Sequence, residues 1–546
     1  MSTRPTLALT ATWALLISPC IASDRFPLYW VAPSGEGFKA AAGDVNGDGM
    51  GDVLLVSTTV VSPSSPQEAF VRSGRNGSLL HSWTPSLPGF WAFSTFYVDP
   101  AGDLNLDGFG DIALAIGGSV LATMVEVRSG YDGSVMTIIP PPVVSNASVI
   151  GFTIAGVGDM DGDGWPQLLI RGDYFLPACS LGHGVYDFEA PGFGLPSFVT
   201  TWQCGQEFGN RIGPVDDVDG DGLPDFYVGA PATDFGGAVE AGWIGIFSGV
   251  TGSLISSLSG TTTFEFLGGN VAALSDVNGD GTPEMALTNV GGVPGITVLS
   301  LPAFTPVFTT LPGGELDTLG DADGDGIDDL LVRGANYPPI SEYITAISGA
   351  TGTLIGTVGQ GLPWSFMSPW GALGDVNGDG LGDFAASPSI YPGTVLPPFA
   401  AQSLWTPWTW PVGSGVPLGS VAHVYVSRNF DLVNAPAVGG TAQFQVVAPK
   451  RAGKLFQVVF AQDFVVPGLP LGPFLFPVAM DGAFWASLSL GIGGTLDATG
   501  HGGVTLPIPN DPALHGAVVQ ASGVVYDPAG PLGIGCVLTQ LPVWIQ

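Results

Sequence analysis

The chain has 546 residues, with 13 Lys and Arg against 47 Asp and Glu, and its formal net charge is −34. A surface this negative repels phosphate, which argues against a nucleic-acid-binding protein, and 45% hydrophobic residues argue against a disordered chain. The 83 Gly and 47 Pro predict an all-β protein of short strands and tight turns, long enough for two or more domains.

The first 22 residues have the pattern of a secretory signal peptide. Arg4 supplies a positive start, residues 7–17 are apolar, and Ala22 ends a small-residue cleavage site. Acylation of Cys20 is an alternative, which Pro19 disfavours because a small residue is expected there. No later apolar run is long enough for a membrane span. We therefore expect an exported protein, secreted or at the cell surface, without a membrane span.

An acidic segment of nine residues recurs seven times along the chain, and its copies begin 45 to 59 residues apart. The segments read DVNGDGMGD from Asp44, DLNLDGFGD from Asp103, DMDGDGWPQ from Asp159, DVDGDGLPD from Asp217, DVNGDGTPE from Asp276, DADGDGIDD from Asp321 and DVNGDGLGD from Asp375. Recurrence at such a period indicates a repeat architecture.

Two further elements recur with the acidic segment. A short apolar run follows each copy and predicts a buried strand; the runs are 53–56, 112–115, 168–170, 226–228, 285–287, 330–332 and 384–386. In four repeats a Ser-Gly-x-x-Gly segment comes 26 to 31 residues after the first Asp, beginning at Ser73, Ser129, Ser248 and Ser348. This segment predicts a hairpin turn whose glycines adopt positive φ.

The repeats predict a seven-bladed β-propeller over residues 23–411. A unit with roughly four strands cannot bury both faces of its sheet alone, whereas repetition around an axis buries each sheet against its neighbours. A linear β-solenoid is the alternative, but its repeats are usually shorter. Ring closure requires the two ends to share a blade, and residues 26–30 and 395–410 are expected to supply those strands.

The acidic segments predict calcium-binding loops. Alternating carboxylates in a tight loop direct oxygen atoms toward one centre, Gly permits the bend, the carbonyl of position 7 adds a ligand, and the acid at position 9 completes the set. Oxygen ligands of this kind suit Ca²⁺ better than Mg²⁺ or Zn²⁺. An Asx-rich surface turn would explain a single segment, but not seven at a near-constant period.

We expect up to seven Ca²⁺ ions, and the third site should be the weakest because Gln167 replaces the acid at position 9. Glu284 has a longer side chain at that position, and Leu106 replaces the Gly at position 4 of the second loop. The candidate ligands are Asp44, Asn46, Asp48, Met50, Asp52, Asp103, Asn105, Asp107, Phe109, Asp111, Asp159, Asp161, Asp163, Trp165, Asp217, Asp219, Asp221, Leu223, Asp225, Asp276, Asn278, Asp280, Thr282, Glu284, Asp321, Asp323, Asp325, Ile327, Asp329, Asp375, Asn377, Asp379, Leu381 and Asp383.

The fourth repeat resembles the FG-GAP repeats of the integrin α-subunit propeller and its bacterial relatives. Phe208-Gly-Asn precedes its acidic loop, and Phe226-Tyr-Val-Gly-Ala-Pro231 follows it. The resemblance covers residues 27–411 and implies the propeller fold and calcium binding. It does not imply one activity, because family members act in adhesion, as matrix or carbohydrate binders, and as accessory domains beside enzymes.

Residues 412–546 lack acidic loops and predict a separate β-sandwich. The strand-like runs are 421–427, 443–447, 455–460, 474–480, 484–490 and 518–526. Its role is either surface attachment or completion of the fold. The cysteines left after removal of the signal peptide are Cys179, Cys204 and Cys536; the first two either form a disulfide or, like Cys536, are buried thiols.

The sequence shows no catalytic motif: the five His are scattered, and neither H-E-x-x-H nor G-x-S-x-G occurs. The tripeptide Arg171-Gly-Asp173 is expected to mark a strand end and turn, and Glu240, Glu265 and Glu315 are expected at the surface. The preferred function is a binding or adhesion module for an extracellular protein or carbohydrate. The alternative is a secreted carbohydrate-active enzyme with its site on one propeller face.

Overall fold

The structure is a computed structural model that describes residues 28–33, 35–57, 68–84, 97–116, 124–139, 148–176, 179–189, 197–202, 207–310, 313–336, 341–358, 370–386, 423–425, 429–434, 436–462, 464–471, 474–480, 482–515 and 517–546. The expected signal peptide (residues 1–22, with Cys20), the expected closing strand 395–410 and Cys204 lie outside these residues. Export and the Cys179–Cys204 pair therefore stay predictions.

The described chain is all-β, with many four-stranded antiparallel sheets, as the sequence predicts. Its helices are α1 (Gly482–Leu490) and four single turns of 3₁₀-helix, η1 (Val290–Gly292), η2 (Pro449–Arg451), η3 (Pro512–Leu514) and η4 (Pro531–Gly533). Within these residues no helix has the length and apolar character needed to cross a bilayer.

Seven four-stranded antiparallel sheets make up the described strands β1 to β28. The first three consist of β2 (Glu36–Gly43), β3 (Asp52–Ser57), β4 (Ala69–Arg72) and β5 (Leu79–Trp83); β6 (Tyr97–Gly102), β7 (Asp111–Ile116), β8 (Met124–Arg128) and β9 (Val135–Ile139); and β10 (Ser148–Gly158), β11 (Gln167–Leu176), β12 (Cys179–Glu189) and β13 (Ser197–Trp202). The next three consist of β14 (Arg211–Val215), β15 (Asp225–Ala230), β16 (Trp243–Phe247) and β17 (Leu254–Ser259); β18 (Val271–Leu274), β19 (Glu284–Thr288), β20 (Ile296–Ser300) and β21 (Thr305–Thr310); and β22 (Glu315–Gly320), β23 (Asp329–Asn336), β24 (Ser341–Ile347) and β25 (Leu354–Val358).

The seventh sheet joins the two ends of this region. It consists of β26 (Trp370–Gly374), β27 (Asp383–Ala386), β28 (His423–Tyr425) and β1 (Leu28–Val31), in that order. Strand β1 overlaps the run 26–30 that was expected to close the ring. Its partner β28 lies beyond residue 411, where the sequence placed the end of the repeats, and pairs with β1 on one side and β27 on the other.

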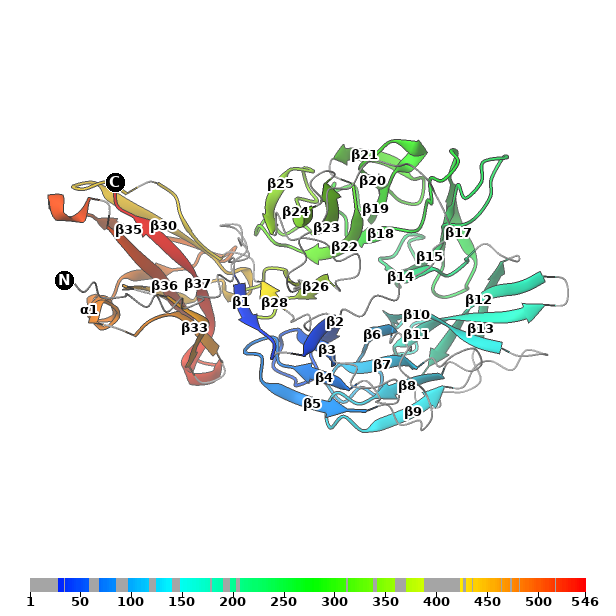
Figure 1. Ribbon diagram of the computed structural model, residues 1–546, viewed down its shortest axis with the longest axis horizontal. Coiled ribbons are helices and arrows are strands. Elements are labelled where there is room, and N and C mark those ends of the chain that lie inside the picture. The colour runs from blue at the N-terminus through cyan, green and yellow to red at the C-terminus, as the bar shows by residue number, and fades with distance from the viewer. Residues whose placement is uncertain are drawn as a thin grey trace, which may run out of the picture.

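The sheets are arranged in a ring, seen nearly face-on in Figure 1. The first strands of successive sheets, β2, β6, β10, β14, β18, β22 and β26, contact one another in this order, and β26 contacts β2. Apolar cores lie between neighbouring sheets, because each sheet buries both of its faces. Leu373 and Ala385 of the seventh sheet, for example, pack with Phe38 and Val53 of the first.

Each acidic loop joins the first and second strands of its sheet, and the seven predicted apolar runs all lie in second strands. Among the residues whose burial the structure describes, most of those in the second strands are buried; all five residues of β19 are, for example. The four Ser-Gly-x-x-Gly segments join third and fourth strands as predicted, and their last glycines adopt φ from 65° to 73°. Glycine fits there because other residues rarely take positive φ.

The two halves of the FG-GAP-like motif meet in the fourth sheet. Phe208 is fully buried, and the N–H of Gly209 donates to the carbonyl of Gly229, 3.0 Å away. A Cβ atom on Gly229 would lie 2.2 Å from the carbonyl oxygen of Gly268. The motif therefore joins its two halves by a backbone hydrogen bond, and its second half packs against Gly268 with no room for a side chain at Gly229.

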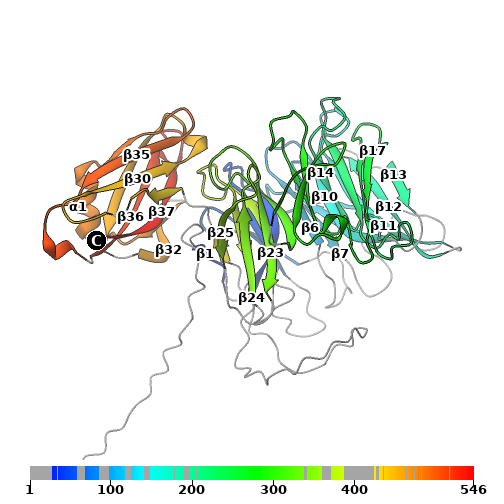
Figure 2. The ribbon, with the colours of Figure 1, turned by 90° about the horizontal axis from the view of Figure 1, so that it is seen from above.

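The C-terminal region, residues 429–546, lies beside the ring, next to β1 (Figures 1 and 2). It contains a sheet of β29 (Phe430–Leu432), β30 (Thr441–Val447) and β35 (His501–Pro507); a sheet of β34 (Gly493–Thr495), β31 (Leu455–Ala461), β36 (Val518–Tyr526) and β37 (Ile534–Trp544); and the pair β32 (Phe464–Leu471) and β33 (Phe474–Val478). Phe430 and Phe444 of the first sheet pack with Val458 and Val525 of the second. Cys536 is a buried free thiol between these sheets.

One element of the C-terminal region differs from the prediction. Residues 484–490 were expected to form a strand because polar and apolar residues alternate, but they form most of helix α1. Phe484 and Ser487 are buried on one side of α1, and the Ser487 hydroxyl accepts the N–H of Phe460 in β31, 2.9 Å away. Over seven residues, an alternating pattern also contains the three- and four-residue spacing of a helix face.

Arg171-Gly-Asp173 lies inside β11, not at a strand end as expected. Arg171 pairs with Val185, and Asp173 pairs with Val149 and His183, so the backbone of the tripeptide is bonded to both neighbouring strands. A tripeptide in the middle of a sheet is not presented as an exposed loop for a receptor.

Candidate metal centres

The seven acidic loops share one set of hydrogen bonds. In the fourth loop, Oδ2 of Asp217 accepts the N–H of Gly222 at 2.8 Å, and Oδ1 of Asp221 accepts the N–H of Leu223 at 3.0 Å. The corresponding bonds, from position 6 to position 1 and from position 7 to position 5, recur in every other loop. These hydrogen bonds to the carboxylates therefore stabilise the turn even without a bound ion.

Position 4 of the loop requires the left-handed backbone conformation. The Gly residues there have φ between 71° and 86°. Leu106 in the second loop adopts the same conformation, with φ 57° and a side chain that is 52% exposed. The second loop therefore keeps its shape at a cost of about 1 kcal/mol in backbone strain.

The acid at position 9 is buried and bonded to backbone N–H groups. Asp225 accepts the N–H of Val218 at 2.8 Å and the N–H of Gly249 at 3.0 Å, and the acids at this position are fully buried in all six loops that have one. Gly249 belongs to a Ser-Gly-x-x-Gly turn, and the same second bond occurs in the other three sheets with this turn. The carboxylate therefore ties the acidic loop to the hairpin turn of its own sheet.

Adjacent acidic loops are also bonded to each other. The N–H of Gly110 donates to the carbonyl of Asp44, the N–H of Gly382 donates to that of Asp321, and the N–H of Gly51 donates to that of Asp375. The last of these bonds connects the first loop to the seventh. A Cβ atom on Gly51 would lie 2.2 Å from the Leu373 carbonyl oxygen, so this contact requires glycine.

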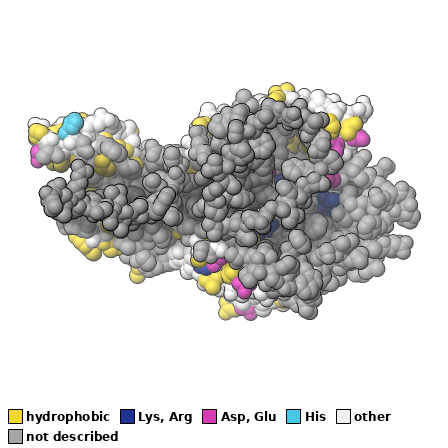
Figure 3. All heavy atoms as spheres, in the orientation of Figure 1, with side chains coloured by type: hydrophobic (Ala, Val, Ile, Leu, Met, Phe, Trp, Pro, Cys, Tyr) yellow, Lys and Arg dark blue, Asp and Glu magenta, His cyan; other side chains and the backbone are white. Residues whose placement is uncertain are grey.

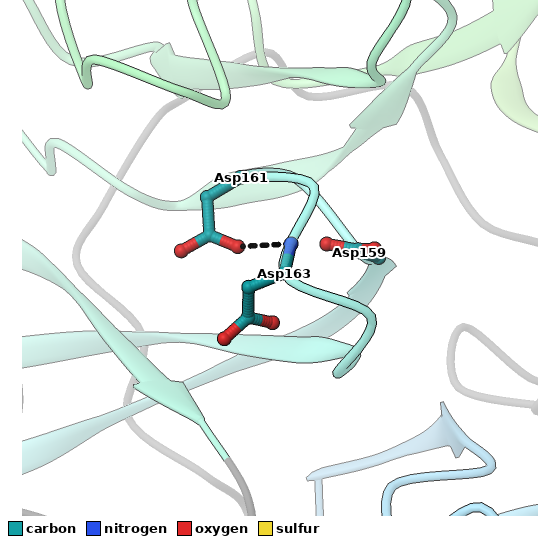
Figure 4. A group of neighbouring side chains, drawn as sticks. All are labelled: Asp159, Asp161 and Asp163. Atoms are coloured by element: carbon teal, nitrogen blue, oxygen red, sulfur yellow. Dashed lines mark hydrogen bonds between the residues drawn. The ribbon is translucent and has the colours of Figure 1, made fainter.

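Four loops bring three carboxylates together with ligand atoms within 4.8 Å of one another. The groups are Asp159, Asp161 and Asp163; Asp217, Asp219 and Asp225; Asp276, Asp280 and Glu284; and Asp321, Asp323 and Asp325. Figure 4 shows the first group, in which all three side chains lie around one loop. The first, second and seventh loops are not among these four groups; they carry Asn at position 3, as does the fifth loop, which is one of the four.

The third loop departs from the others at position 9. Oε1 of Gln167 accepts the N–H of Met160 at 2.6 Å, so Gln167 replaces the acid in this bond. Its Nε2 donates to Oδ1 of Asp161, 3.2 Å away, which places an N–H group against one of the candidate ligands. That the third site is the weakest stays a prediction.

The residues of the loops fit a calcium ion. Their donors are carboxylate, amide and carbonyl oxygens, which are the ligands that a hard cation of flexible coordination prefers. Asp44, Asn46, Asp48, the carbonyl of Met50, and Asp52 would hold the ion in the first loop, and the equivalent positions would hold it in the others. When bound, the cation would neutralise carboxylates that otherwise repel one another.

Burial raises the pKa of several position-9 acids. It raises the pKa of Asp52 and of Asp329 to about 8, and that of Asp111 to about 6, although backbone N–H groups oppose the shift. A carboxyl group whose folded-state pKa is raised binds protons more tightly in the folded state than in the unfolded state. Burial therefore favours the protonated form of these position-9 acids.

The metal-free protein is expected to lose stability as the pH rises from about 4 to about 8. The stabilising contribution of protonated Asp52 and Asp329 is complete below the unfolded-state pKa, near 4, and is lost as the pH passes their folded-state values of about 8. Urea unfolding of calcium-free protein at pH 5 and pH 8 measures the effect. A urea midpoint at pH 8 that equals or exceeds the midpoint at pH 5 would contradict this prediction. With calcium present, the midpoint should instead be higher at pH 8, because protons and cations compete for the carboxylates.

A second site lies on loops between sheets and contains two exposed aromatic side chains. Phe264 and Phe266 are 61% and 44% exposed, their ring centroids are 6.1 Å apart, and their ring planes are inclined by 28°. Both have positive φ, as does the neighbouring Glu240. The N–H of Phe264 donates to the carbonyl of Val239, another exposed apolar residue. We call Phe264 and Phe266 the aromatic pair.

Glu265 holds the aromatic pair in place. Glu265 was expected at the surface, but its side chain is buried. Its Oε2 accepts the N–H groups of Thr261 and Thr262 at 2.9 Å, and its Oε1 accepts the N–H of Gly291 in η1 at 2.7 Å. Because the residue between two exposed Phe side chains is fixed by three backbone bonds, the rings are displayed on a rigid loop.

No family model matches the chain. Integrin alpha-7 of Homo sapiens is 29% identical over 153 residues, which are 24% of this chain and 13% of that protein. Integrin alpha-IIb of Homo sapiens is 27% identical over 219 residues, or 37% of this chain and 20% of that protein. Part of this chain is similar to the integrin α subunits. Integrin alpha-8 of Gallus gallus shows similar identity, 29% over 150 residues, covering 24% of this chain and 14% of that protein.

The matched stretch spans a fifth or less of the length of these integrin α subunits. Among solved structures, BBS1N in complex with ARL6DN gives a TM-score of 0.42 at 9% identity, over 74% of this chain and 97% of that chain. Rhamnogalacturonan lyase YesW gives a TM-score of 0.34 at 13% identity, over 67% of this chain and 73% of that chain. Neither structural similarity is close enough to carry an argument about function.

Proposed function

We propose that this integrin α relative is an exported, calcium-stabilised seven-bladed β-propeller followed by a β-sandwich, and that it serves as a binding or adhesion module for an extracellular protein or carbohydrate. The ring of seven four-stranded sheets supports the propeller, and the shared loop geometry supports calcium at up to seven positions. Because β28 pairs with β1 and β27, we place the end of the propeller after Tyr425.

The observation that carries the binding function is the aromatic pair. Two adjacent exposed Phe rings cost solvation, and positive φ costs about 1 kcal/mol or more for each residue. Such costs persist where a surface is used, and exposed aromatic side chains are frequent anchors in binding sites. On the face shown in Figure 3, hydrophobic and acidic side chains lie next to one another along described parts of the ring, and a few Lys or Arg side chains are also visible. The net charge of −34 suits uncharged or basic ligands rather than anionic ones.

The same site favours binding over carbohydrate chemistry. A glycosidase requires two carboxyl groups that are free to exchange a proton or attack a sugar. Glu265, the carboxylate between the two Phe residues, accepts three backbone N–H bonds and one hydroxyl bond. All of these bonds hold the loop, so Glu265 supports the surface and is not available as an acid or nucleophile.

A screen of extracellular-matrix proteins and glycans, with and without calcium, tests the function. The wild-type protein is expected to bind one of these classes in calcium, and the double variant Phe264→Ala, Phe266→Ala should bind at least about tenfold more weakly, because each aromatic anchor contributes roughly 1 kcal/mol or more. Alanine retains a Cβ atom, so these substitutions remove the rings without relaxing the backbone.

Leu354→Ala is the matched control, because Leu354 is a single exposed apolar residue at the start of β25, with 64% exposure. Its binding should equal that of the wild type. Failure of the wild-type protein to bind any protein or glycan in calcium would reject the proposed function. If the wild type and the double variant bind equally well, the aromatic pair is not part of the binding site.

A further inference from the structure

The C-terminal region covers the seventh acidic loop. The ammonium group of Lys450, in η2, lies 3.0 Å from Oδ2 of Asp375 at position 1 of this loop. Nε of the next residue, Arg451, donates to the carbonyl of Gly378 at 3.1 Å. A Cβ atom on Gly380 would lie 3.0 Å from the backbone nitrogen of Lys450. The loop and η2 are therefore in direct contact through both side chains and backbone.

This cover makes the seventh loop unlike the others. Its position-5 acid, Asp379, is fully buried, and Asn377 at position 3 is 2% exposed. The position-5 acid is half-buried in the first loop and exposed in the second to sixth, at Asp107, Asp163, Asp221, Asp280 and Asp325. Water can therefore solvate these five carboxylates, but not that of Asp379.

The Asp379 carboxylate is incompletely bonded. Its Oδ1 accepts the N–H of Leu381 at 2.8 Å, whereas its Oδ2 is buried and has no hydrogen-bond partner among the described residues. The two basic residues of η2 interact elsewhere: Lys450 with Asp375, and Arg451 with Asp527 and with backbone carbonyls. A buried carboxylate without a compensating charge opposes the contact that buries it.

The first loop takes part in the same interface. The side chain of Met50, at position 7, is 2% exposed and packs with Val459, Phe476 and Val537 of the C-terminal region. A Cβ atom on Gly378 would lie 2.3 Å from Cε of Met50. The apolar contact at the first loop therefore favours docking, while the uncompensated acid of the seventh loop opposes it.

We propose that the seventh loop is an interdomain calcium site, in which a bound ion compensates the Asp379 carboxylate and so stabilises docking of the C-terminal region on the ring. The proposal rests on the proposed calcium binding of the loops. Asp375, Asn377, Asp379, the carbonyl of Leu381, and Asp383 would hold the ion. Calcium in the second to fifth loops, whose position-5 acids face water, would stabilise individual sheets without changing docking.

Trypsin cleavage of the full chain tests the proposal, because η2 carries a trypsin site, Arg451, in the interface. The Arg451 side chain is 21% exposed and donates to the carbonyls of Gly378 and Gly535, so cleavage there requires undocking, whereas Lys450, at 54% exposure, does not report on docking. Cleavage at Arg128, which is 7% exposed within the second sheet, requires unfolding of the ring. Transfer of the wild-type protein from calcium to chelator is expected to speed cleavage at Arg451 roughly tenfold or more, ahead of cleavage at Arg128. Mass spectrometry of the fragments distinguishes the two sites.

Asp379→Asn tests the charge directly. The amide has almost the same shape but no charge, so docking of this variant should be as protease-resistant in chelator as in calcium. The matched control Asp221→Asn changes the same position in the exposed fourth loop and should keep the wild-type dependence on calcium. Lys450→Ala removes a positive charge beside the loop carboxylates and leaves Arg451 as the trypsin site of η2. The rate of cleavage at Arg451 in this variant should therefore differ more between calcium and chelator than it does in the wild type.

The outcomes separate this inference from the proposed function. Calcium binding by the wild type, measured by titration calorimetry, together with unchanged cleavage at Arg451 in chelator, would overturn the interdomain site but not the calcium loops. Asp379→Asn that remains as calcium-dependent as Asp221→Asn would overturn it as well. Absence of any calcium binding by the wild type would instead reject the calcium-stabilised propeller on which the inference rests.

Discussion

Removal of calcium is expected to lower the thermal midpoint of the protein by about 5 °C or more. At the affinities typical of extracellular calcium modules, millimolar calcium contributes about 0.5 to 1.5 kcal/mol per site, and up to seven sites add several kcal/mol. The clustered loop acids repel one another without a cation, which adds to the loss. Differential scanning calorimetry in calcium and in chelator measures the shift.

Magnesium at the same concentration is the control for this melt. Because Mg²⁺ requires a tighter octahedral shell and releases its water reluctantly, it should restore only a minor part of the loss. An identical melting curve with and without chelator would show that the loops hold their shape through hydrogen bonds alone. Equal rescue by magnesium would contradict the selectivity expected from the loop ligands.

Asp225→Ala is expected to destabilise the protein by about 3 kcal/mol even in chelator, whereas Asp221→Ala should have little effect there. Asp225 is buried and accepts the N–H groups of Val218 and Gly249, which its removal leaves unpaired. Asp221 is exposed, and its side chain accepts a single N–H within the loop. Urea unfolding of both variants in chelator measures the difference.

The same two variants separate the two roles of the loop when calcium is added. Both variants should lose the stability that calcium binding to the fourth loop adds, since both positions are candidate ligands. Asp225→Asn is an informative intermediate, because the amide oxygen can accept one N–H, as that of Gln167 does from Met160. Equal destabilisation by Asp225→Ala and Asp221→Ala in chelator would show that position 9 has no separate structural role.

Much of the ring could be predicted because its determinants are local. The acidic loop, the apolar second strand and the Ser-Gly-x-x-Gly turn each specify their own backbone conformation within a few residues, and all three lie where the sequence places them. Recurrence converts these local predictions into an architecture, since identical units must pack in the same way. In the fourth repeat, whose residues carry the resemblance to integrin α subunits, Phe208 is buried and the N–H of Gly209 donates to the carbonyl of Gly229.

The features that the sequence could not predict depend on contacts between distant segments. Strand β28 is a short run at 423–425 whose place in the seventh sheet is set by β1, almost 400 residues earlier. Helix α1 packs on β31 through Phe484 and Ser487, which short-range alternation does not reveal. Arg171-Gly-Asp173 continues a strand because β10 and β12 extend beside it.

The candidate sites could be predicted only in part, because some of their features also depend on contacts between distant segments. The spacing of the loop acids indicates a cation, and four loops bring three acids together. The spacing does not indicate that Asp225 also binds a turn 24 residues later, or that Asp379 alone among the position-5 acids is buried by the C-terminal region. Glu265 was expected at the surface because charged residues usually are; three backbone N–H groups compensate its burial.

A crystal structure of the protein grown in millimolar calcium tests the central proposal most directly. It should show cations in the acidic loops, each bound by oxygen atoms at about 2.3 to 2.6 Å, with the third loop the least occupied and the seventh enclosed beneath η2. Loops that are vacant under these conditions, or sheets stacked in an open row instead of a ring, would contradict it.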